Sequence, residues 1–383
     1  VIASIQQAVG RFMFCALAPM LYNVGIIIGT VWFTGGVNLF GWQIFDGGIM
    51  GVALGVVLGS FLQLIVSAVG LAGLGFDYNF KIYWRNKGFR KVLSLLPARS
   101  VDQGMDYVVS LVEVNLASRL ADGTVRAYQQ ALTLHMMPIN LIGVAISNAA
   151  FPQLTEHLGE GRNDLFQKDL RSLLRIIFWM ALPVSVVIFF TRGYVVHFIR
   201  NGGKQLIAGI LGCLVVAILF RTIYHMAARA FYVRQDTKTP LYISIFSITL
   251  NIILAIVLSM VLKMGAYGLA WAQSTVAVLE VVVLLVVMNR QMPKLFDMTF
   301  VRAIFKMIIA GTITGVVCYI AVLIMPFRYH DDSFFSAFPK FAIISLISFG
   351  AYAAASKWLK LPEIDPILAR LKKVLFGRLE FKD

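Results

Sequence analysis

The sequence predicts an all-α, polytopic membrane protein, and three observations lead to this prediction. Hydrophobic residues make up 59% of the 383 residues and charged residues only 14%, far from the balance of soluble proteins. Apolar runs of about twenty residues, the length that crosses a bilayer as a helix, recur along the whole chain. A membrane β-barrel would instead show short segments of alternating polarity.

Ten membrane-spanning helices are expected, of which the third and fourth are the least apolar. Residues 1–9 resemble the end of a helix, and the sequence begins with Val1, so we expect a chain truncated at its amino end. The approximate spans are 13–33, 48–72, 100–120, 126–152, 172–191, 205–228, 240–262, 266–288, 303–325 and 335–356.

The net charge of +15 is explained by membrane topology better than by nucleic-acid binding. Basic residues are concentrated in alternate loops, at 73–99, 153–175, 229–238 and 289–302, while the loop at 34–47 has none. Positive loops of membrane proteins stay on the cytoplasmic side. We therefore expect both ends of the chain to be cytoplasmic and no nucleic-acid partner.

The stretch 228–240 joins two spans and is predicted to be a tight cytoplasmic turn. Asp236 and Thr237 can cap the following helix, and Pro240 suits its first turn, where no amide donor is needed. The stretch holds no nucleophile and no set of metal ligands. The cysteines lie in apolar runs without metal-binding spacing, so no metal site or cofactor is predicted.

A weak internal repeat links the early and late spans. Pro19-Met20-Leu21-Tyr22 resembles Pro240-Leu241-Tyr242, and Gly51-Val52-Ala53-Leu54 resembles Gly268-Leu269-Ala270-Trp271. The two matches have nearly the same offset and enclose about six spans. An even number of spans per repeat predicts two lobes of the same orientation, related by an axis along the membrane normal.

Polar residues within the spans are the candidate functional residues, because burying them in hydrocarbon is costly. Asp102, Asp106, Ser110 and Glu113 fall on one face of the third helix. A second stripe on the fourth helix contains Gln129, Thr133, Met136, Asn140, Gly143 and Ser147. Two such stripes suggest the wall of a water-filled cavity, the alternative being hydrogen bonds that only hold helices together.

Arg221 and His225 lie one turn apart in the sixth span and could attract an anionic head group. The alternative is a structural ion pair of Arg221 with Glu113 or Glu280. Gln273, Thr275 and Glu280 could complete this polar centre. A further alternative is an oxygen-rich cation site that adds Glu113 and Asn251.

Three segments together resemble the MurJ/MviN family, the lipid II flippases of bacterial cell-wall synthesis. They are 228–240, 18–23 and 143–154, and their order and spacing fit the family from its fourth helix to its last. The resemblance covers essentially the whole chain. It implies about fourteen helices in the multidrug/oligosaccharidyl-lipid/polysaccharide exporter superfamily: two pseudo-symmetric lobes and two extra helices, of which this chain contains about ten.

The domain organisation follows from this resemblance. We expect a cytoplasmic amphipathic tail at 359–383, lying on the anionic leaflet. The other expected parts are the end of the first lobe at 1–72, a cytoplasmic loop at 73–99, the second six-helix lobe at 100–292 and the two extra helices at 300–358.

One position departs from the family pattern. Relatives usually have an essential arginine a few residues before the proline that matches Pro138, and this chain has Thr133 there. The other family arginines lie in helices that precede this sequence. Arg221 is therefore the residue expected to substitute, whereas Glu113 lies where relatives often have an acidic residue.

The resemblance implies a flippase, not an enzyme, in the bacterial cytoplasmic membrane. Its expected partner is an undecaprenyl-diphosphate-linked glycopeptide, with a coupling ion left open, and the substrate-binding residues would be Arg221, His225, Glu113, Gln129, Thr133 and Asn140. No P-loop is present, so direct use of ATP is not expected. The alternatives are an exporter of another polyprenyl-linked glycan, a non-transporting scaffold for cell-wall synthesis and an integral-membrane transferase.

Overall fold

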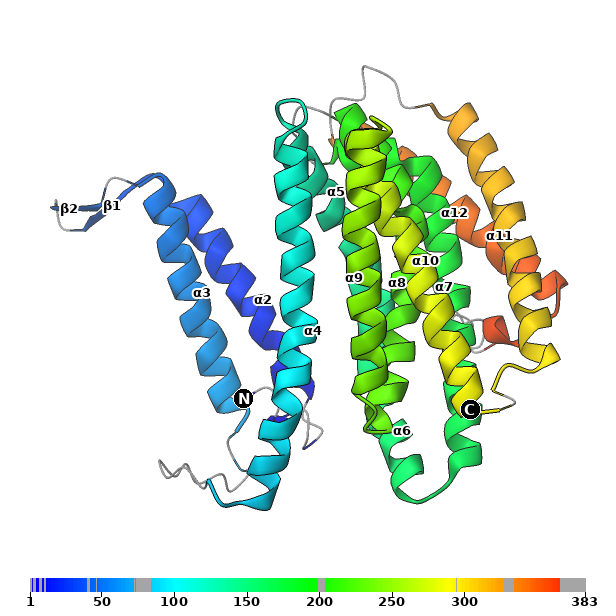
Figure 1. Ribbon diagram of the computed structural model, residues 1–383. Helices are drawn as coiled ribbons and strands as arrows, with labels where there is room; N and C mark the ends of the chain where they lie inside the picture. Colours follow the sequence, from blue (N-terminus) through cyan, green and yellow to red (C-terminus); the bar gives the residue numbers. More distant parts are fainter. Residues whose placement is uncertain are drawn as a thin grey trace, which may run out of the picture. The chain divides into compact units, whose positions relative to one another are not determined.

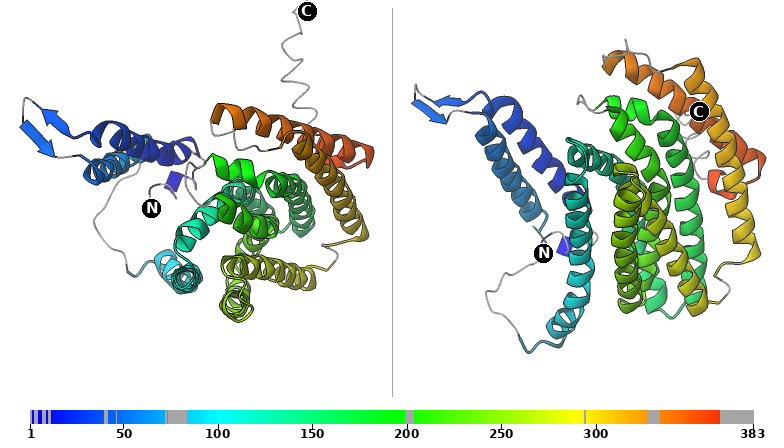
Figure 2. Two further views of the ribbon diagram at one scale, coloured as in Figure 1. Left: turned by 90° about the horizontal axis from the view of Figure 1, so that it is seen from above. Right: turned by 45° about the horizontal axis from the view of Figure 1, so that its top comes forward.

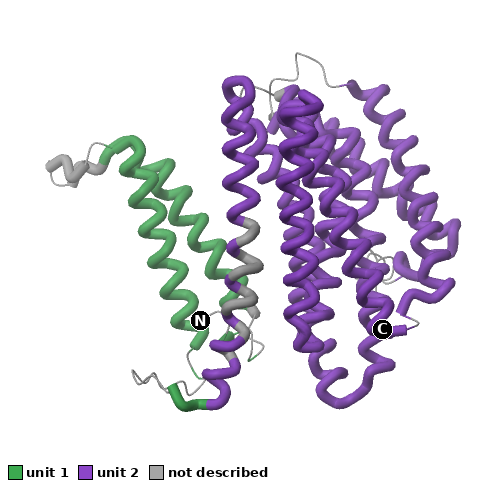
Figure 3. The backbone as a smooth tube through the Cα atoms, in the orientation of Figure 1, with its two compact units in different colours: residues 1–86 green, residues 87–383 purple. Residues whose placement is uncertain are grey.

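The computed structural model describes residues 2, 5–6, 9, 12–39, 42–45, 47–71, 73, 84–198, 204–293, 295–326 and 334–365. This part of the chain is helical apart from one short β-hairpin, which confirms the predicted all-α class (Figure 1). It forms two compact units, Val1–Asn86 and Lys87–Asp383, distinguished in Figure 3. Each unit is described by itself.

The first unit is built on a pair of helices in very close contact. Helix α2 (Phe12–Ile28) continues as a π-helical turn η1 (Gly29–Phe33) and is followed by helix α3 (Ile49–Val69). Gly25 and Gly29 of the first helix meet Gly55 and Gly59 of the second. A Cβ on Gly55 would lie 2.6 Å from the Cα of Gly29, so the backbones themselves are in contact.

The loop between these helices carries a short antiparallel hairpin. Strand β1 (Val37–Leu39) pairs with strand β2 (Trp42–Phe45), with Leu39 opposite Trp42. The sequence analysis predicted no strands, and these two lie outside the membrane-spanning ranges.

The second unit is a bundle of nine α-helices in its described part, seen nearly end-on in the left view of Figure 2. We call the end where α4 begins the Lys87 end and the opposite end the Ser118 end. The helical elements are α4 (Lys87–Ser118), α5 (Thr124–Pro138), η2 (Ile139–Val144), α6 (Ala145–Gly159), α7 (Asn163–His197), α8 (Lys204–Val233), α9 (Lys238–Ile256), η3 (Val257–Val261), α10 (Ala266–Gln291), α11 (Met298–Ile324), α12 (Phe334–Trp358) and the 3-10 turn η4 (Pro362–Ile364).

Across the described residues, nine helical segments are long and apolar enough to cross a membrane, with α5, η2 and α6 counting as one. Only the third expected span falls short, because the apolar part of α4 is limited to Tyr107–Ser118. Helix α4 also begins at Lys87, so residues 87–99 of the expected loop are helical. Hydropathy locates the part of a helix that suits hydrocarbon, whereas basic residues such as Arg90 and Lys91 are good helix formers outside it.

Helix α8 lies at the centre of this unit, packed against α5, α6, α7 and α10. One apolar cluster, including Leu170, Met226 and Leu284, fills the Lys87 half of the bundle. A second cluster, including Tyr128 and Leu214, fills the other half. On α8, Arg221 lies between Leu214 of the second cluster and Met226 of the first.

The repeat in the sequence is also present in the backbone. Like α2, α9 ends in a π-helical turn, and the helix that follows starts after a glycine of nearly the same conformation: φ 63° and ψ −135° at Gly48, φ 59° and ψ −135° at Gly265. Three residues later, Gly51 and Gly268 each pack directly on the backbone of the preceding helix. An L-residue rarely adopts the positive φ of these caps, which accounts for glycine at both.

The turn between α8 and α9 is capped by one of the two predicted residues. The carboxylate of Asp236 accepts hydrogen bonds from the backbone N and the hydroxyl of Thr239, at 3.0 and 2.6 Å, whereas the Thr237 side chain makes no capping bond. Burial disfavours the charged form, but the hydrogen bonds outweigh it and hold the pKa of Asp236 below its usual value.

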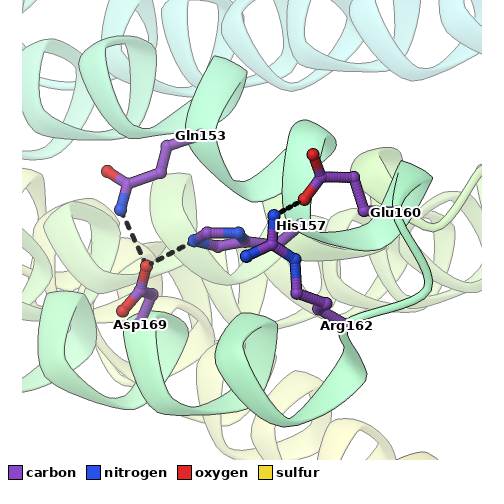
Figure 4. A network of polar contacts seen from close by, with 5 residues as sticks. All are labelled: Gln153, His157, Glu160, Arg162 and Asp169. Carbon is purple, nitrogen blue, oxygen red and sulfur yellow. Dashed lines mark hydrogen bonds and ion pairs between the residues drawn. The ribbon is translucent and has the colours of Figure 1, made fainter.

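A polar network ties α6 to α7 at the Lys87 end (Figure 4). The Asp169 carboxylate accepts a hydrogen bond from Gln153 at 2.8 Å and lies 3.1 Å from the ring nitrogen of His157. Arg162 pairs with Glu160 in the intervening turn. These contacts fix the direction in which α7 leaves the turn.

Two arginines of α7 hold the pair α11–α12. Arg171 contacts Asp297, the N-cap of α11, at 2.7 Å, and Arg175 pairs with Glu363 just beyond α12. The Trp179 indole donates to the hydroxyl of Ser356 at 3.0 Å. The start of α11 and the segment just beyond α12 are thus both attached to α7.

The expected tail begins differently from the prediction. Leu361 and Ile364 are each only 2% exposed and pack in a cluster with Trp179, so they face protein and not a lipid surface. The Arg175–Glu363 pair holds this segment in place. The remainder of the predicted amphipathic helix lies outside the described residues.

Candidate functional site

A cavity of about 780 Å³ lies inside the second unit, among α4, α5, α8, α9 and α10. Its walls combine apolar side chains with an unusual number of polar ones for the interior of a membrane-spanning bundle. The polar lining consists of Ser110, Glu113, His135, Arg221, Tyr224, His225, Arg229, Tyr232, Thr237, Ser244, Ser247, Asn251, Gln273 and Glu280.

Arg221 and Glu280 form an ion pair in the wall of this cavity. A terminal guanidinium nitrogen of Arg221 lies 2.9 Å from a carboxylate oxygen of Glu280. The Arg221 side chain is 26% exposed, whereas that of Glu280 is 4% exposed. Of the two acids considered from the sequence, Glu280 is thus the one in contact with Arg221.

Glu113 is held by an amide from another helix. The side-chain N of Gln273 donates to the Glu113 carboxylate at 2.8 Å, and Glu113 is only 2% exposed. An isolated carboxylate at such a position would be costly. Gln273 supplies one hydrogen bond to Glu113, which lines the cavity.

Two further polar side chains are buried without a protein partner for their polar atoms. These are Asn251, 2% exposed, and His135, 3% exposed. Buried polar groups almost always have a hydrogen-bond partner, either protein or ordered water. The cavity is therefore able to receive water or a polar ligand at these two side chains.

Helix α8 contributes a column of basic residues to the cavity. Arg221, His225 and Arg229 recur at four-residue intervals, which places them on one face of the helix. The column runs from the middle of α8 toward the Lys87 end of the bundle. The guanidinium of Arg229 lies over the ring of Phe151, 5.6 Å from its centroid.

Of the predicted substrate-binding residues, Glu113, Arg221 and His225 line this cavity, and Gln129, Thr133 and Asn140 do not. The second group is exposed on the outer face of α5 and η2, where the Thr133 hydroxyl donates to the backbone O of Gln129 at 2.9 Å. These three residues of the predicted second cavity wall thus lie on an exposed surface of this unit, whereas Met136 of the same stripe lines the cavity.

The stripe that contains these residues also breaks partway along. Gly143 is buried, with only 2.8 Å between its would-be Cβ and the backbone O of Thr222, and Ser147 is fully buried. The exposed face continues instead through Leu141 and Ala145. The cause is the π-helical turn η2 that follows Pro138, because an added residue in one turn shifts every later side chain around the helix axis.

Several cavity residues were not singled out from the sequence, although some carried a signal. Ser244 and Ser247 of α9 were missed, yet with Asn251, which was named, they follow a helical i, i+3, i+7 spacing, so a stripe on this helix was detectable. His135 carried no pattern, and Thr275, expected in the polar centre, is exposed. The side chains of Asp102 and Asp106 lie outside the described part.

No group of three or more His, Cys, Asp or Glu residues is arranged for a metal ion among the residues that the structure describes. The oxygen-rich cation alternative combined Glu113 and Asn251 with Gln273, Thr275 and Glu280, and of these all but Thr275 line the cavity. Glu113 and Gln273 of this set are joined by a hydrogen bond.

Comparison with known proteins gives a consistent result. The family model described as lipid II flippase MurJ matches residues 1–338. A probable lipid II flippase MurJ of Thermotoga maritima is 26% identical over 373 residues, covering 96% of this chain and 69% of the relative. One from Borreliella burgdorferi is 25% identical over 280 residues, covering 72% and 53%. The chain thus spans between about half and two thirds of the length of these relatives.

Solved structures show the same fold. One described as lipid II flippase MurJ in an inward closed conformation aligns with a TM-score of 0.65 and 23% identity, over 96% of this chain and 68% of the other. An outward-facing MATE-family multidrug resistance transporter of the MOP superfamily aligns with a TM-score of 0.63 and 15% identity, over 77% and 66%. At these identities the likeness establishes the fold.

Proposed function

The chain belongs to the MurJ family of lipid II flippases, and from this premise we propose that it moves a lipid-linked peptidoglycan precursor across the bacterial cytoplasmic membrane. The cargo is an undecaprenyl-diphosphate-linked glycopeptide, carried from the inner to the outer leaflet. Transport proceeds by alternating access of two lobes, without chemical conversion of the substrate.

The observation that carries this proposal is the cavity with Arg221 in its wall. A diphosphate that leaves water needs a compensating charge, because desolvating an anion alone is prohibitive. Arg221 offers a planar fork of donors that suits phosphate oxygens. His225, one turn away on the same wall, adds a further donor to the binding surface.

Glu280 competes with the substrate phosphate for contact with Arg221. In the structure Arg221 is already neutralised by Glu280, so a phosphate has to compete with a buried carboxylate for the same guanidinium. Such an exchange of partners permits binding and release in turn, since neither anion then leaves Arg221 uncompensated. Glu113 acts in the same cavity as the acidic residue that Gln273 orients.

Gln129, Thr133 and Asn140 would contact the glycopeptide from the exposed face of α5. Their amide and hydroxyl groups are suited to hydrogen bonding with sugar and peptide groups. The polyprenyl tail would remain beside α11 and α12, where large apolar side chains such as Phe305 and Leu346 are 64% and 73% exposed. A coupling ion could bind through Glu113 and Asn251.

Lipid II translocation in reconstituted vesicles tests this proposal. Arg221→Ala should remove nearly all transport, whereas Arg221→Lys keeps a point charge and should retain part of it. Glu280→Gln is the informative companion, because it frees Arg221 from its partner and should tighten phosphate binding while slowing release. Wild-type rates from Arg221→Ala would refute the role of Arg221.

The proposed topology has its own test. Both chain ends and positions Lys87, Asn163 and Lys373 are assigned to the cytoplasm, and Gly36 and His330 to the opposite side, on the basis of loop charge. Single cysteines at these positions, in a background without cysteine, should react with an impermeant reagent in intact cells only at 36 and 330. Labelling at position 87 would reverse the assignment.

A non-transporting scaffold for cell-wall synthesis is the second candidate, favoured by Thr133 in place of the family arginine. One experiment distinguishes the flippase from the scaffold. If neither the wild type nor Thr133→Arg moves lipid II in these vesicles, the scaffold is the better explanation. An increase with Thr133→Arg would show that the exposed face of α5 meets the substrate.

A further inference from the structure

A second hollow, of about 530 Å³, lies on the outer surface of the second unit and is separate from the cavity above. It is a groove between α4 and the end of α9, two helices that run side by side (Figure 1). Its apolar lining is Leu111, Val112, Leu116, Ile256 and Met260. Leu111 is 71% exposed, so the groove opens away from the protein core.

The groove is polar at one end only. Asn115 and Arg119 complete its lining, and the Nε of Arg119 donates to the side-chain O of Asn115 at 3.2 Å. No described residue accepts a hydrogen bond from the terminal nitrogens of Arg119 within the contacts of the structure. The guanidinium is therefore oriented by Asn115 and still has donors available for an anion.

The dimensions match one leaflet of a bilayer. Leu111 and Arg119 are eight positions apart on α4, which corresponds to roughly 12 Å along a helix axis. One leaflet contributes about half of a hydrocarbon core that is roughly 30 Å thick. The apolar part of α4 is Tyr107–Ser118, so Arg119, the next residue, is expected at the depth of lipid head groups, with Leu111 deeper.

The charge at this end of the unit is the second observation. Arg119, Arg126 and Lys263 are all exposed there, against one nearby acid, Asp122. Loop charge assigns this end to the outside, where basic residues are otherwise few. Lys263 follows Met260, a groove residue, in the turn after η3. Topology does not account for this local basic excess, whereas an anionic ligand does.

We propose that this groove binds an anionic glycerophospholipid of the leaflet at the Ser118 end. One acyl chain lies along Leu111, Leu116 and Ile256, and the phosphate contacts Arg119. The volume is that of a site for a small ligand, within the range of about 300–1,000 Å³ typical of such pockets. It suits a single acyl chain and is too small for the long polyprenyl tail of the proposed cargo. The site does not depend on what the chain transports.

Photo-crosslinking tests the proposal directly. The purified chain is reconstituted in vesicles that contain a trace of phosphatidylglycerol with a diazirine in its acyl chain, and the labelled peptides are mapped by mass spectrometry. Label is expected in 111–116 and 256–260, and unlabelled phosphatidylglycerol should compete for it better than phosphatidylcholine does. Arg119→Gln should lower this labelling about fivefold, the value of one basic residue at an anionic lipid surface.

Matched variants make the outcome decisive. Arg126→Gln removes an equal charge at the same end without lining the groove and should leave the labelling unchanged. Leu111→Trp should fill the groove and abolish the label while the thermal unfolding of the chain stays unchanged. Equal labelling by phosphatidylcholine, or equal losses in Arg119→Gln and Arg126→Gln, would overturn the proposal. Stronger competition by a polyprenyl diphosphate than by phosphatidylglycerol would also overturn it.

Discussion

The hairpins α2–α3 and α9–α10 share a backbone plan but differ in the side chains that they carry. In both, the first helix ends in a π-helical turn, and a glycine of positive φ starts the second. In α2–α3 the contact is glycine on glycine, whereas the position that corresponds to Gly55 in the repeat is Ala272 in α10. The second hairpin also carries Asn251, Gln273 and Glu280, which line the cavity.

This difference shows that the same helical hairpin can be used for close packing in one place and for positioning polar side chains in another. Two backbones in direct contact leave no room for side chains, so α2–α3 is a packing element. In the second hairpin, α10 instead carries an amide and a carboxyl group, Gln273 and Glu280, which reach Glu113 of α4 and Arg221 of α8. The polar chemistry of the described chain is therefore expected to depend on the second hairpin, and the following variants test that expectation.

The largest effect, on translocation, is expected at Glu113, which accepts a hydrogen bond from Gln273 of the second hairpin. Glu113→Ala should lose essentially all translocation, because the cavity loses its oriented acid and Gln273 loses its acceptor. The measurement is complementation of a flippase-depleted strain at normal membrane abundance. Growth equal to the wild type would place Glu113 with the residues that only hold the bundle together.

The Arg221–Glu280 pair should show the next largest effect, on stability. Arg221→Ala leaves a buried carboxylate without its partner, which costs about 3 kcal/mol. In a Glu280→Gln background the same substitution should cost only about 1 kcal/mol, the value of an ordinary hydrogen bond. A double-mutant cycle of unfolding free energies measures this. Additive effects would mean that the pair is not formed in the membrane.

A smaller loss is expected from closing the gap between glycines in the first hairpin. Gly55→Ala places a methyl group 2.6 Å from the Cα of Gly29 and should destabilise the chain by about 2 kcal/mol. The reverse change at the matching position, Ala272→Gly, should cost only about 1 kcal/mol. Thermal unfolding in detergent compares the two. A neutral Gly55→Ala would contradict the direct backbone contact.

The smallest effect on stability is expected for the exposed polar residues of α5. Thr133→Val and Gln129→Leu remove exposed polar groups, of which the Thr133 hydroxyl bonds only within its own helix, so each should change the unfolding free energy by less than about 0.5 kcal/mol. Gly143→Ala, on the buried side of the same helical run, is the contrasting variant and should be clearly destabilising. Similar losses in all three would refute the division into an exposed and a buried face.

Much of this fold could be predicted from local patterns, because membrane spans are defined by composition and length. Glu113 and Arg221 were found since a charge within an apolar run stands out in any sequence. The choice of Glu280 over Glu113 as the partner of Arg221 could not be predicted, because it depends on the packing of α8 against α10. The predicted continuation of the polar stripe from α5 through Gly143 and Ser147 was wrong for a related reason. A π-helical turn rotates the side chains that follow it around the helix axis, and the residues themselves give no clear signal of such a turn.

The attachment of α11 to α7 has a mechanical consequence. Asp297 at the start of α11 contacts Arg171, and the carbonyl of Met325 at its end accepts a hydrogen bond from the hydroxyl of Tyr194. Fixed at both ends, α11 tilts whenever α7 tilts. Its 27 residues make a rod roughly 40 Å long, so a tilt of about 5° displaces its far end by about 3 Å. The pair α11–α12 is thus expected to act as a stiff lever arm that moves together with α7.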